Sequence, residues 1–247
     1  VINYDSARYM LEQNPGIVVG WEDMNALRGF DGVSKKVCFV QGEVFINRQE
    51  TFKDIHVWYS SKWNQRSVGH PGPIVSPFVD PSIFYPLKKS KFRDEPIRVL
   101  LQARKDGKGK LDQVLQYIEK CNMFEFKILS DVSEEEFAKE MREADIFFAH
   151  SFPEGFGLPA LEAMASKTLV VGYTGGGGTD FIFNSRNCYC TRDGNAFAVA
   201  NSLVSMAFGK KYELYDHILE EGYKTATETY SRERTKVELQ KSLALEE

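Results

Sequence analysis

The sequence contains no apolar run of the roughly 20 residues that a membrane-spanning helix needs. It also opens without the charged and then apolar stretch of a secretory leader. Both absences lead us to expect a soluble, cytoplasmic protein. A basic surplus is missing too, because 31 Lys and Arg stand against 35 Asp and Glu. Proteins that bind nucleic acid usually show such a surplus, so no nucleic-acid partner is expected.

Cysteine is scarce, with 4 in 247 residues, which excludes a disulfide framework at this length. Cys188 and Cys190 stand one residue apart and lack a second pair of ligands, so a zinc site is not expected. Free, partly buried thiols in a reducing compartment are the simpler interpretation.

Short runs rich in Val, Ile and Leu alternate with longer amphipathic stretches. The expected strands cover residues 17–19, 37–41, 55–59, 97–101, 126–129, 146–149 and 169–172. The expected helices cover residues 111–120, 134–142, 159–165, 195–207 and 212–230. Apolar strands that alternate with helices predict an α/β fold whose parallel sheets are covered on both faces.

Proline is concentrated in one stretch, since 5 of the 9 prolines fall within residues 71–86. Dense proline forbids a continuing helix or central strand, which predicts an extended linker. We therefore expect a small N-terminal domain, residues 1–76, and a larger C-terminal α/β domain, residues 77–247.

The strongest local signal is residues 151–165, S-F-P-E-G-F-G-L-P-A-L-E-A-M-A, between an expected strand and an expected helix. Gly155 and Gly157 would let the backbone approach a ligand closely. The helix start would offer free N–H groups to an anion. Glu154 and Glu162 could both face the crevice at the strand ends, where open α/β sheets bind ligands.

Two other interpretations of this segment stay open on the residues alone. Gly155-Phe-Gly157-Leu-Pro-Ala160 also fits the G-x-G-x-x-A dinucleotide pattern, but it follows the third strand of its domain rather than the first. Alternatively, it is only a tight strand–helix corner with two exposed glutamates.

The wider pattern resembles the family 4 retaining glycosyltransferases, which have the GT-B fold. Glu154 and Glu162 have the E-x7-E spacing of that family, within E-G-F-G-L-P-x-L-E-A-M-A. Three further segments match in order: the linker at residues 77–86, the strand with Arg104 and Lys108-Gly109, and Gly176-Gly177-Gly178-Thr179-Asp180, with Asp180 where Glu is usual. The resemblance covers about residues 74–235.

The resemblance implies two Rossmann-like parallel-sheet domains, the N-terminal one on the acceptor side and small or incomplete. Only about four strands fit before the linker, and the family's glycine-rich N-terminal loop is absent. Residues 36–43 are similar to the F-V-Q-x-x-E stretch of some relatives, which makes Glu43 the expected acceptor-side residue. The last helix is expected to cross back onto the first domain.

The resemblance also implies roles for residues of the donor site. Arg104 and Lys108 would bind the diphosphate, with Lys105 and Lys110 as alternatives to Lys108. Glu154 would contact the transferred sugar, and Glu162 the ribose hydroxyls. The remaining donor-binding residues would be Ser151, Gly155, Phe156, Gly157 and Leu158.

The expected reaction moves a sugar from a nucleoside-diphosphate-sugar donor to a saccharide or lipid-linked acceptor, as in polysaccharide biosynthesis. A D-x-D motif is missing, so neither a catalytic metal nor another cofactor is expected. The basic segment 86–110, with nine Lys and Arg, could touch acidic lipid at the inner membrane face. Two alternatives remain open: a nucleotide-sugar epimerase on the same fold, and a non-catalytic nucleotide-sugar-binding module.

Overall fold

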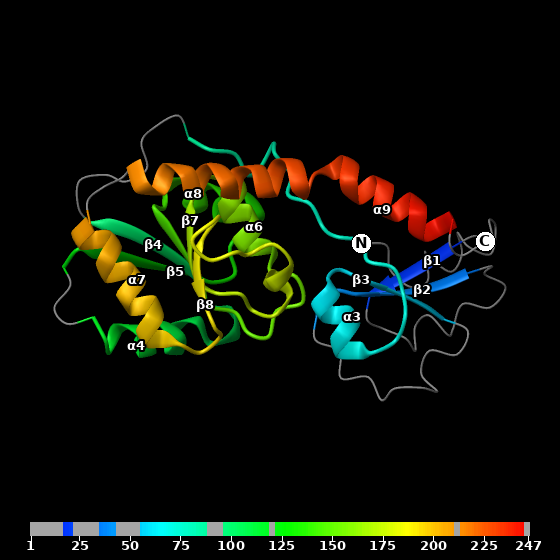
Figure 1. Ribbon diagram of the computed structural model, residues 1–247, viewed down its shortest axis with the longest axis horizontal. Helices are drawn as coiled ribbons and strands as arrows, with labels where there is room; N and C mark the ends of the chain where they lie inside the picture. Colours follow the sequence, from blue (N-terminus) through cyan, green and yellow to red (C-terminus); the bar gives the residue numbers. More distant parts are fainter. Residues whose placement is uncertain are drawn as a thin grey trace. The chain divides into compact units, whose positions relative to one another are not determined.

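The computed structural model describes residues 17–21, 35–42, 55–87, 96–118, 122–209 and 213–244 (Figure 1). The chain divides into two compact units. The N-terminal unit comprises Val1–Ser76 together with Val237–Glu247, and the C-terminal unit comprises Pro77–Lys236. Glu43, the expected acceptor-side residue, lies outside the described residues.

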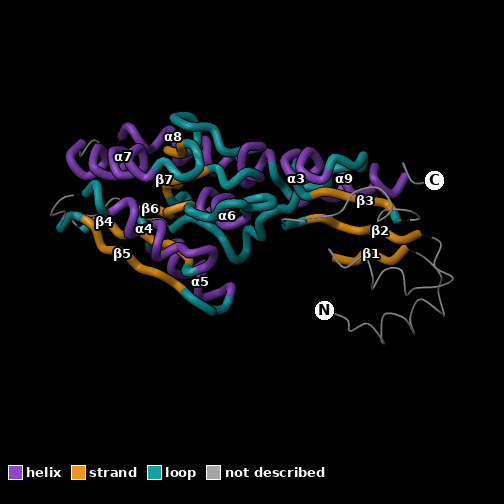
Figure 2. Tube along the Cα trace, turned by 90° about the horizontal axis from the view of Figure 1, so that it is seen from below, coloured by secondary structure: helices purple, strands orange, loops and turns teal. Residues whose placement is uncertain are grey.

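The N-terminal unit is built on a parallel sheet in the order β1-β2-β3 (Figure 2). The strands are β1 (Ile17–Trp21), β2 (Lys35–Val40) and β3 (His56–Tyr59). Val37, Trp58 and Val75 form its buried cluster, and Leu243 packs against them from the C-terminal end of the chain. A hydrogen bond of 2.7 Å from the Ser76 N–H to the Glu238 carboxylate adds a second link to that end.

Helix α3 (Lys62–Val68) follows β3 and was not predicted from the sequence, because its residues are mostly polar. Its ends nevertheless carry the ordinary signals. The Ser61 hydroxyl accepts from the Asn64 N–H at 3.0 Å, and Gly69 ends the helix in the left-handed conformation.

The C-terminal unit contains a five-stranded sheet in the order β5-β4-β6-β7-β8. The strands are β4 (Ile97–Gln102), β5 (Phe124–Leu129), β6 (Ile146–Ala149), β7 (Leu169–Tyr173) and β8 (Tyr189–Thr191). Every strand pairing among the described residues is parallel. The prediction of an α/β chain with parallel sheets is therefore confirmed.

Both faces of this sheet are covered, which explains its nearly continuous apolar strands. Leu100 and Phe147 pack on one face, in the buried cluster that also includes residues of helices α5 (Glu134–Glu143) and α6 (Leu158–Ala165). Their neighbours Val99, Ile146 and Phe148 pack on the opposite face. That second cluster includes residues of α4 (Gly107–Leu115), α7 (Ala196–Gly209) and α8 (Glu213–Lys224).

The C-terminal stretch differs from the single helix expected over residues 212–230. Helix α8 passes into a π-helical turn, Thr225–Thr229, and the helical conformation ends at Tyr230. A further helix, α9 (Arg232–Ala244), follows, and its residues from Val237 onward belong to the N-terminal unit. No helix in the described part of the chain is both long and apolar enough to cross a membrane.

Candidate functional site

The strand order defines where a ligand should bind. From β4 the chain passes to β5 on one side and then to β6, β7 and β8 on the other. In open α/β sheets of this order, ligands occupy the crevice outside the carboxyl ends of the strands at the point of reversal, here between β4 and β6. The loops that leave these two strand ends carry most of the site residues predicted from the sequence.

The turn after β4 has an unusual backbone. Arg104, Lys105 and Asp106 form one 3-10 turn, in which Lys105 and Asp106 have φ of 50° and 57°. This left-handed conformation costs a residue other than glycine about 1–2 kcal/mol. Asp106 then caps helix α4 by accepting from the Gly109 N–H at 3.3 Å. The result is a sharp turn with the Arg104 and Lys105 side chains exposed.

His150 ties the ends of β4 and β6 together. It is 2% exposed, and its Nε2 lies 2.7 Å from the Gln102 carbonyl oxygen. Burial lowers the pKa of His150, so the neutral ring donates its Nε2 proton to that carbonyl. A Cβ atom at Gly107 would lie 2.8 Å from the same Nε2, and only glycine fits between the two loops.

Helix α6 presents its amino end at the crevice. Gly157 is the N-cap, Pro159 stands in the first turn, and no side chain caps the helix. Pro159 has no N–H, and the Ala160 N–H donates to the Gly157 carbonyl at 3.0 Å, so the helix start favours an anionic ligand mainly through the positive end of the helix dipole. Leu158, the first residue of the helix, is half-buried.

The loop before this helix is anchored through Phe156. Its buried ring stacks on Phe181 at 5.1 Å between centroids and meets Tyr230 edge-on at 5.5 Å. Gly155 and Gly157 on either side are buried as well. The side chain of Phe156 thus belongs to the core, while its backbone runs along the start of α6.

Glu154 is paired with a lysine of the β4 turn. Its Oε2 lies 3.3 Å from the Lys105 Nζ, and the same ammonium donates a hydrogen bond to the Pro153 carbonyl. Lys108, which the resemblance matches to the diphosphate motif, is exposed on the first turn of α4. Lys105 was only an alternative in the sequence interpretation, and it is the lysine that contacts Glu154.

Glu162 is a buried carboxyl group, 8% exposed, on the second turn of α6. Burial is the main cause that raises its pKa to about 8, and the nearby Glu134 carboxylate raises it further. The Arg104 guanidinium acts in the opposite direction. Arg104, Glu134 and Glu162 are therefore brought within electrostatic reach of one another. Glu134 was not predicted as a site residue, since only the fold brings the start of α5 close to α6.

A small hollow of about 30 Å³ lies at the ends of β6 and β7. Its lining includes Ser151, Glu154, Gly157 and Thr174. Room for one water molecule corresponds to roughly this volume, so the hollow can form only the floor of a site for a larger ligand. Ser151, Glu154 and Gly157 are thus gathered at one place, as the motif suggested.

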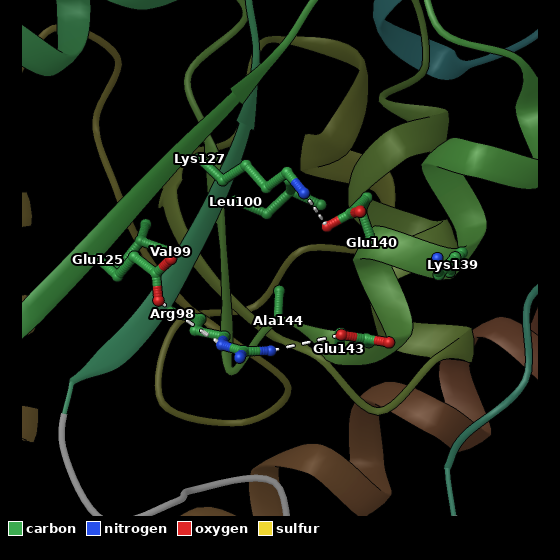
Figure 3. A pocket seen from close by; sticks show the side chains of 9 residues that line it. All are labelled: Arg98, Val99, Leu100, Glu125, Lys127, Lys139, Glu140, Glu143 and Ala144. Atoms are coloured by element: carbon green, nitrogen blue, oxygen red, sulfur yellow. Dashed lines mark hydrogen bonds and ion pairs between the residues drawn. The ribbon is translucent and has the colours of Figure 1, made fainter.

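A second, larger hollow of about 200 Å³ lies at the opposite ends of the strands, between α5 and strands β4 and β5 (Figure 3). Three ion pairs are formed among its charged side chains, which number three basic and three acidic with Lys139 included: Lys127 with Glu140 at 2.7 Å, and Arg98 with Glu143 at 3.4 Å and Glu125 at 3.7 Å. Because these charges are mutually compensated, the hollow offers no surplus charge to a ligand.

The C-terminal unit therefore has the architecture of open α/β domains, in which a ligand binds where the strand order of a parallel sheet reverses. Residues 105–225 match the family model described as glycosyl transferases group 1. The match covers just under half of the chain, and it confirms the resemblance to family 4 glycosyltransferases.

A curated relative, a probable sucrose-phosphate synthase from Thermosipho melanesiensis, is 25% identical to the chain. The match covers 65% of this chain and 44% of the relative, so the chain spans less than half of that protein's length.

Solved structures agree with the expected GT-B-type fold. HepE from Anabaena, in complex with UDP and glucose, gives a TM-score of 0.76 at 14% identity, covering 98% of this chain and 81% of HepE. TarM, from S. aureus, gives 0.75 at 17% identity, covering 98% of this chain and 58% of TarM. At such identities the likeness establishes the fold alone, and it confirms the two-sheet architecture with a small N-terminal sheet.

Proposed function

We propose that the chain transfers a sugar from a uridine diphosphate sugar to a saccharide or lipid-linked acceptor, with retention of the anomeric configuration. One observation carries the proposal: the crevice at β4 and β6 gathers groups suited to each part of such a donor. The match of residues 105–225 to the group 1 family model supports sugar transfer. Solved neighbours in complex with UDP and with UDP-glucose support uridine as the nucleoside.

The diphosphate would meet cations and the start of α6. The Arg104 guanidinium can bind phosphate oxygens through two parallel hydrogen bonds, and a lysine ammonium adds a compact charge. Each such contact contributes about 1.5–3 kcal/mol. The helix start adds a favourable dipole. Of the two lysines, Lys105 is supported by its contact with Glu154 and Lys108 by the resemblance.

The two glutamates would hold hydroxyl groups. Glu162, one turn inside α6, would accept hydrogen bonds from the ribose hydroxyls, and the Arg104 charge beside it favours its ionised form. Glu154 would contact hydroxyls of the transferred sugar. Its ion pair with Lys105 compensates its charge.

The reaction would break the bond between the anomeric carbon and a phosphate oxygen and form a bond from the acceptor oxygen on the same face. The proton of the acceptor hydroxyl would pass to the departing phosphate. Glu154 and Glu162 would then act in binding and orientation rather than as the nucleophile and acid of a glycosidase. Stabilisation of the leaving diphosphate by Arg104, the lysine and the helix start would supply most of the catalysis.

The first test is a thermal-shift and calorimetric screen with UDP, GDP, ADP, CMP and dTDP, each with and without EDTA. A ligand at 100 times its dissociation constant stabilises the folded protein by about 2.7 kcal/mol. A selective shift with UDP that EDTA leaves unchanged is expected. The variant Glu162→Ala should lose the shift, and Glu233→Ala, at an exposed position of α9, should keep it. A Glu162→Ala variant that binds UDP normally would contradict the proposed donor site.

Product analysis separates transfer from the two alternatives. A transferase releases UDP in step with a new glycosidic bond, whose anomeric configuration NMR can read. An epimerase converts the donor sugar without releasing UDP. A binding module does neither, although it binds UDP. Retention, UDP release and insensitivity to EDTA together are the expected result.

A further inference from the structure

Glu154 is held by a glycine-rich segment that lies directly along its backbone. The Glu154 N–H donates to the Gly175 carbonyl at 2.6 Å, and the Gly177 N–H donates to the Glu154 carbonyl at 2.8 Å. Glu154 and Gly176 thereby form a parallel β-bridge. The loop after β6 and the segment after β7 are thus paired main chain to main chain.

The pairing leaves no room for side chains. A Cβ atom at Gly175 would lie 2.7 Å from the Ser151 carbonyl oxygen, and one at Gly177 would lie 2.2 Å from the Gly155 carbonyl oxygen. Four successive glycines, Gly175–Gly178, lose more conformational entropy on ordering than any other tetrapeptide. Since these glycines have no side chains of their own, groups outside the four must help to fix the segment: the Thr179 hydroxyl donates to the Gly176 carbonyl at 2.6 Å, and a further group acts on Gly175.

Asp193 supplies that group from the turn after β8. Its Oδ1 accepts the Gly175 N–H at 2.8 Å, and its Oδ2 lies 3.5 Å from the Thr174 hydroxyl oxygen. The negative charge of Asp193 also reaches the buried Tyr173. Burial is the main cause that raises the pKa of Tyr173, and the Asp193 carboxylate is the second. A hydrogen bond from a backbone N–H to a charged acceptor is among the stronger ones in proteins.

A capping role does not explain Asp193. It stands just before helix α7, where an aspartate often serves as N-cap. That place is taken by Asn195, whose side-chain oxygen accepts from the Ala198 N–H at 3.1 Å. The Asp193 carboxylate instead accepts its hydrogen bond from Gly175, in the segment that is paired with Glu154.

We propose that Asp193 is a positioning residue that fixes the sugar-contacting carboxylate of Glu154 through the backbone of Gly175. Gly175 accepts from the Glu154 N–H through its carbonyl and donates to Asp193 through its N–H, so the bond to Asp193 holds the residue to which the Glu154 backbone is bound. The role rests on the proposed function of Glu154. Loss of Asp193 should disturb the sugar end of the site and leave the ribose and diphosphate contacts of Glu162 and Arg104 in place.

The test compares Asp193→Ala, Asp193→Asn and the control Asp216→Ala, which removes an exposed carboxylate on α8. Hydrogen exchange of peptides spanning residues 151–157 and 174–178 is measured with UDP bound. Donor turnover with water as acceptor is measured with UDP-glucose, UDP-galactose and UDP-N-acetylglucosamine. Calorimetry gives the affinity for UDP itself.

In Asp193→Ala we expect faster exchange in both peptides, UDP affinity within about twofold, and turnover of the best donor lowered at least tenfold, since small displacements of a positioning group have effects of this size. Asp193→Asn keeps one acceptor oxygen and should stay within about threefold of the parent. Unchanged exchange and turnover in Asp193→Ala would overturn the positioning role. If Asp193→Ala does not fold, Asp193→Asn decides the matter. A turnover loss of more than tenfold in Asp193→Asn, without faster hydrogen exchange in the two peptides, would also overturn the positioning role.

Failure of UDP to bind the unmodified protein would refute the proposed function instead. In that case the exchange comparison between the unliganded proteins still decides whether Asp193 orders the Glu154 loop. The two outcomes are therefore distinguishable.

Discussion

The Lys105 ammonium and the Glu154 carboxylate lie 3.3 Å apart, across the two loops that leave neighbouring strands β4 and β6. The left-handed backbone of Lys105, with φ of 50°, belongs to the tight turn from which this ammonium reaches Glu154. A conformation with an energetic cost at a ligand crevice is common in functional sites. The pair links the expected sugar side of the crevice to its expected phosphate side.

Replacing Lys105 should therefore slow transfer from the sugar donor. We expect Lys105→Met to lower kcat/KM for the donor at least tenfold, through loss of a charge that stabilises the leaving diphosphate. Lys108→Met should lower kcat/KM less than threefold if Lys105 is the principal ammonium of the site. Steady-state kinetics and calorimetry on both variants check this, with Lys139→Met on α5 as control. The reverse order of effects would restore Lys108 to the role implied by the resemblance.

Donor affinity should depend on pH through Glu162. Its pKa is about 8 in the unliganded protein, so it is mostly neutral at pH 6.5. Ribose hydroxyls that donate to the carboxylate favour the ionised form, and binding must then release a proton. We expect UDP-glucose affinity to fall roughly 10- to 30-fold from pH 8.5 to 6.5 and to level off above pH 8. Calorimetry in buffers of different ionisation enthalpy would measure the proton release directly, and a flat profile would contradict the assignment.

The same carboxyl group should make the free protein less stable at high pH. Because the folded-state pKa of Glu162 is raised above its unfolded value, its contribution is fully present below the unfolded pKa of 4.5 and is lost as pH rises through about 8. Glu162→Gln, which cannot ionise, should gain about 2–4 kcal/mol relative to the parent between pH 5 and 8.5. Urea unfolding at both pH values tests this. An equal pH response of parent and variant would show that Glu162 is ionised in the free protein.

Glu134 should tune this pH dependence without binding the donor itself. Its carboxylate raises the pKa of Glu162, so Glu134→Gln should lower that pKa and move the midpoint of the affinity profile to lower pH. Glu135→Gln, the neighbouring exposed position on the same helix, serves as the matched control. An unchanged midpoint in Glu134→Gln would mean that the two carboxylates do not interact in solution.

Much of this arrangement could be predicted from the sequence, for a physical reason. The strands covering residues 146–149 and 169–172 are apolar throughout because helices cover both faces, and such runs are visible in a single sequence. The segment 151–165 combines strand, turn and helix signals within a few residues. Strand β8 was missed because three residues, one of them buried, carry too short a pattern.

The rest depends on contacts between segments far apart in the chain. Whether Lys105 or Lys108 faces Glu154 is decided by two successive left-handed residues that no local rule requires. The approach of Glu134 to Glu162 needs the packing of α5 against α6. Asp193 meets Gly175 only because β7 and β8 end side by side. Sequence motifs thus predict the loops of the candidate site, whereas the fold determines which charges pair within it.

The close pairing of the two loops gives a final prediction that separates steric from conformational effects. A Cβ atom at Gly177 would lie 2.2 Å from the Gly155 carbonyl oxygen and 2.5 Å from the Phe156 nitrogen. Gly177→Ala must therefore displace the backbone at the start of α6, and we expect UDP affinity to fall more than tenfold.

Gly69→Ala provides the opposite case for comparison. Gly69 has φ of 70° with open space around its Cβ position, so the substitution strains the backbone by about 1–2 kcal/mol but clashes with nothing. It should lower the melting temperature and leave UDP affinity unchanged. Gly177→Ala should thus affect binding through a steric clash, whereas Gly69→Ala should affect stability through backbone strain. Similar UDP affinities in the two variants would show that nucleotide binding does not depend on the close pairing of the Glu154 loop with the glycine-rich segment 175–178.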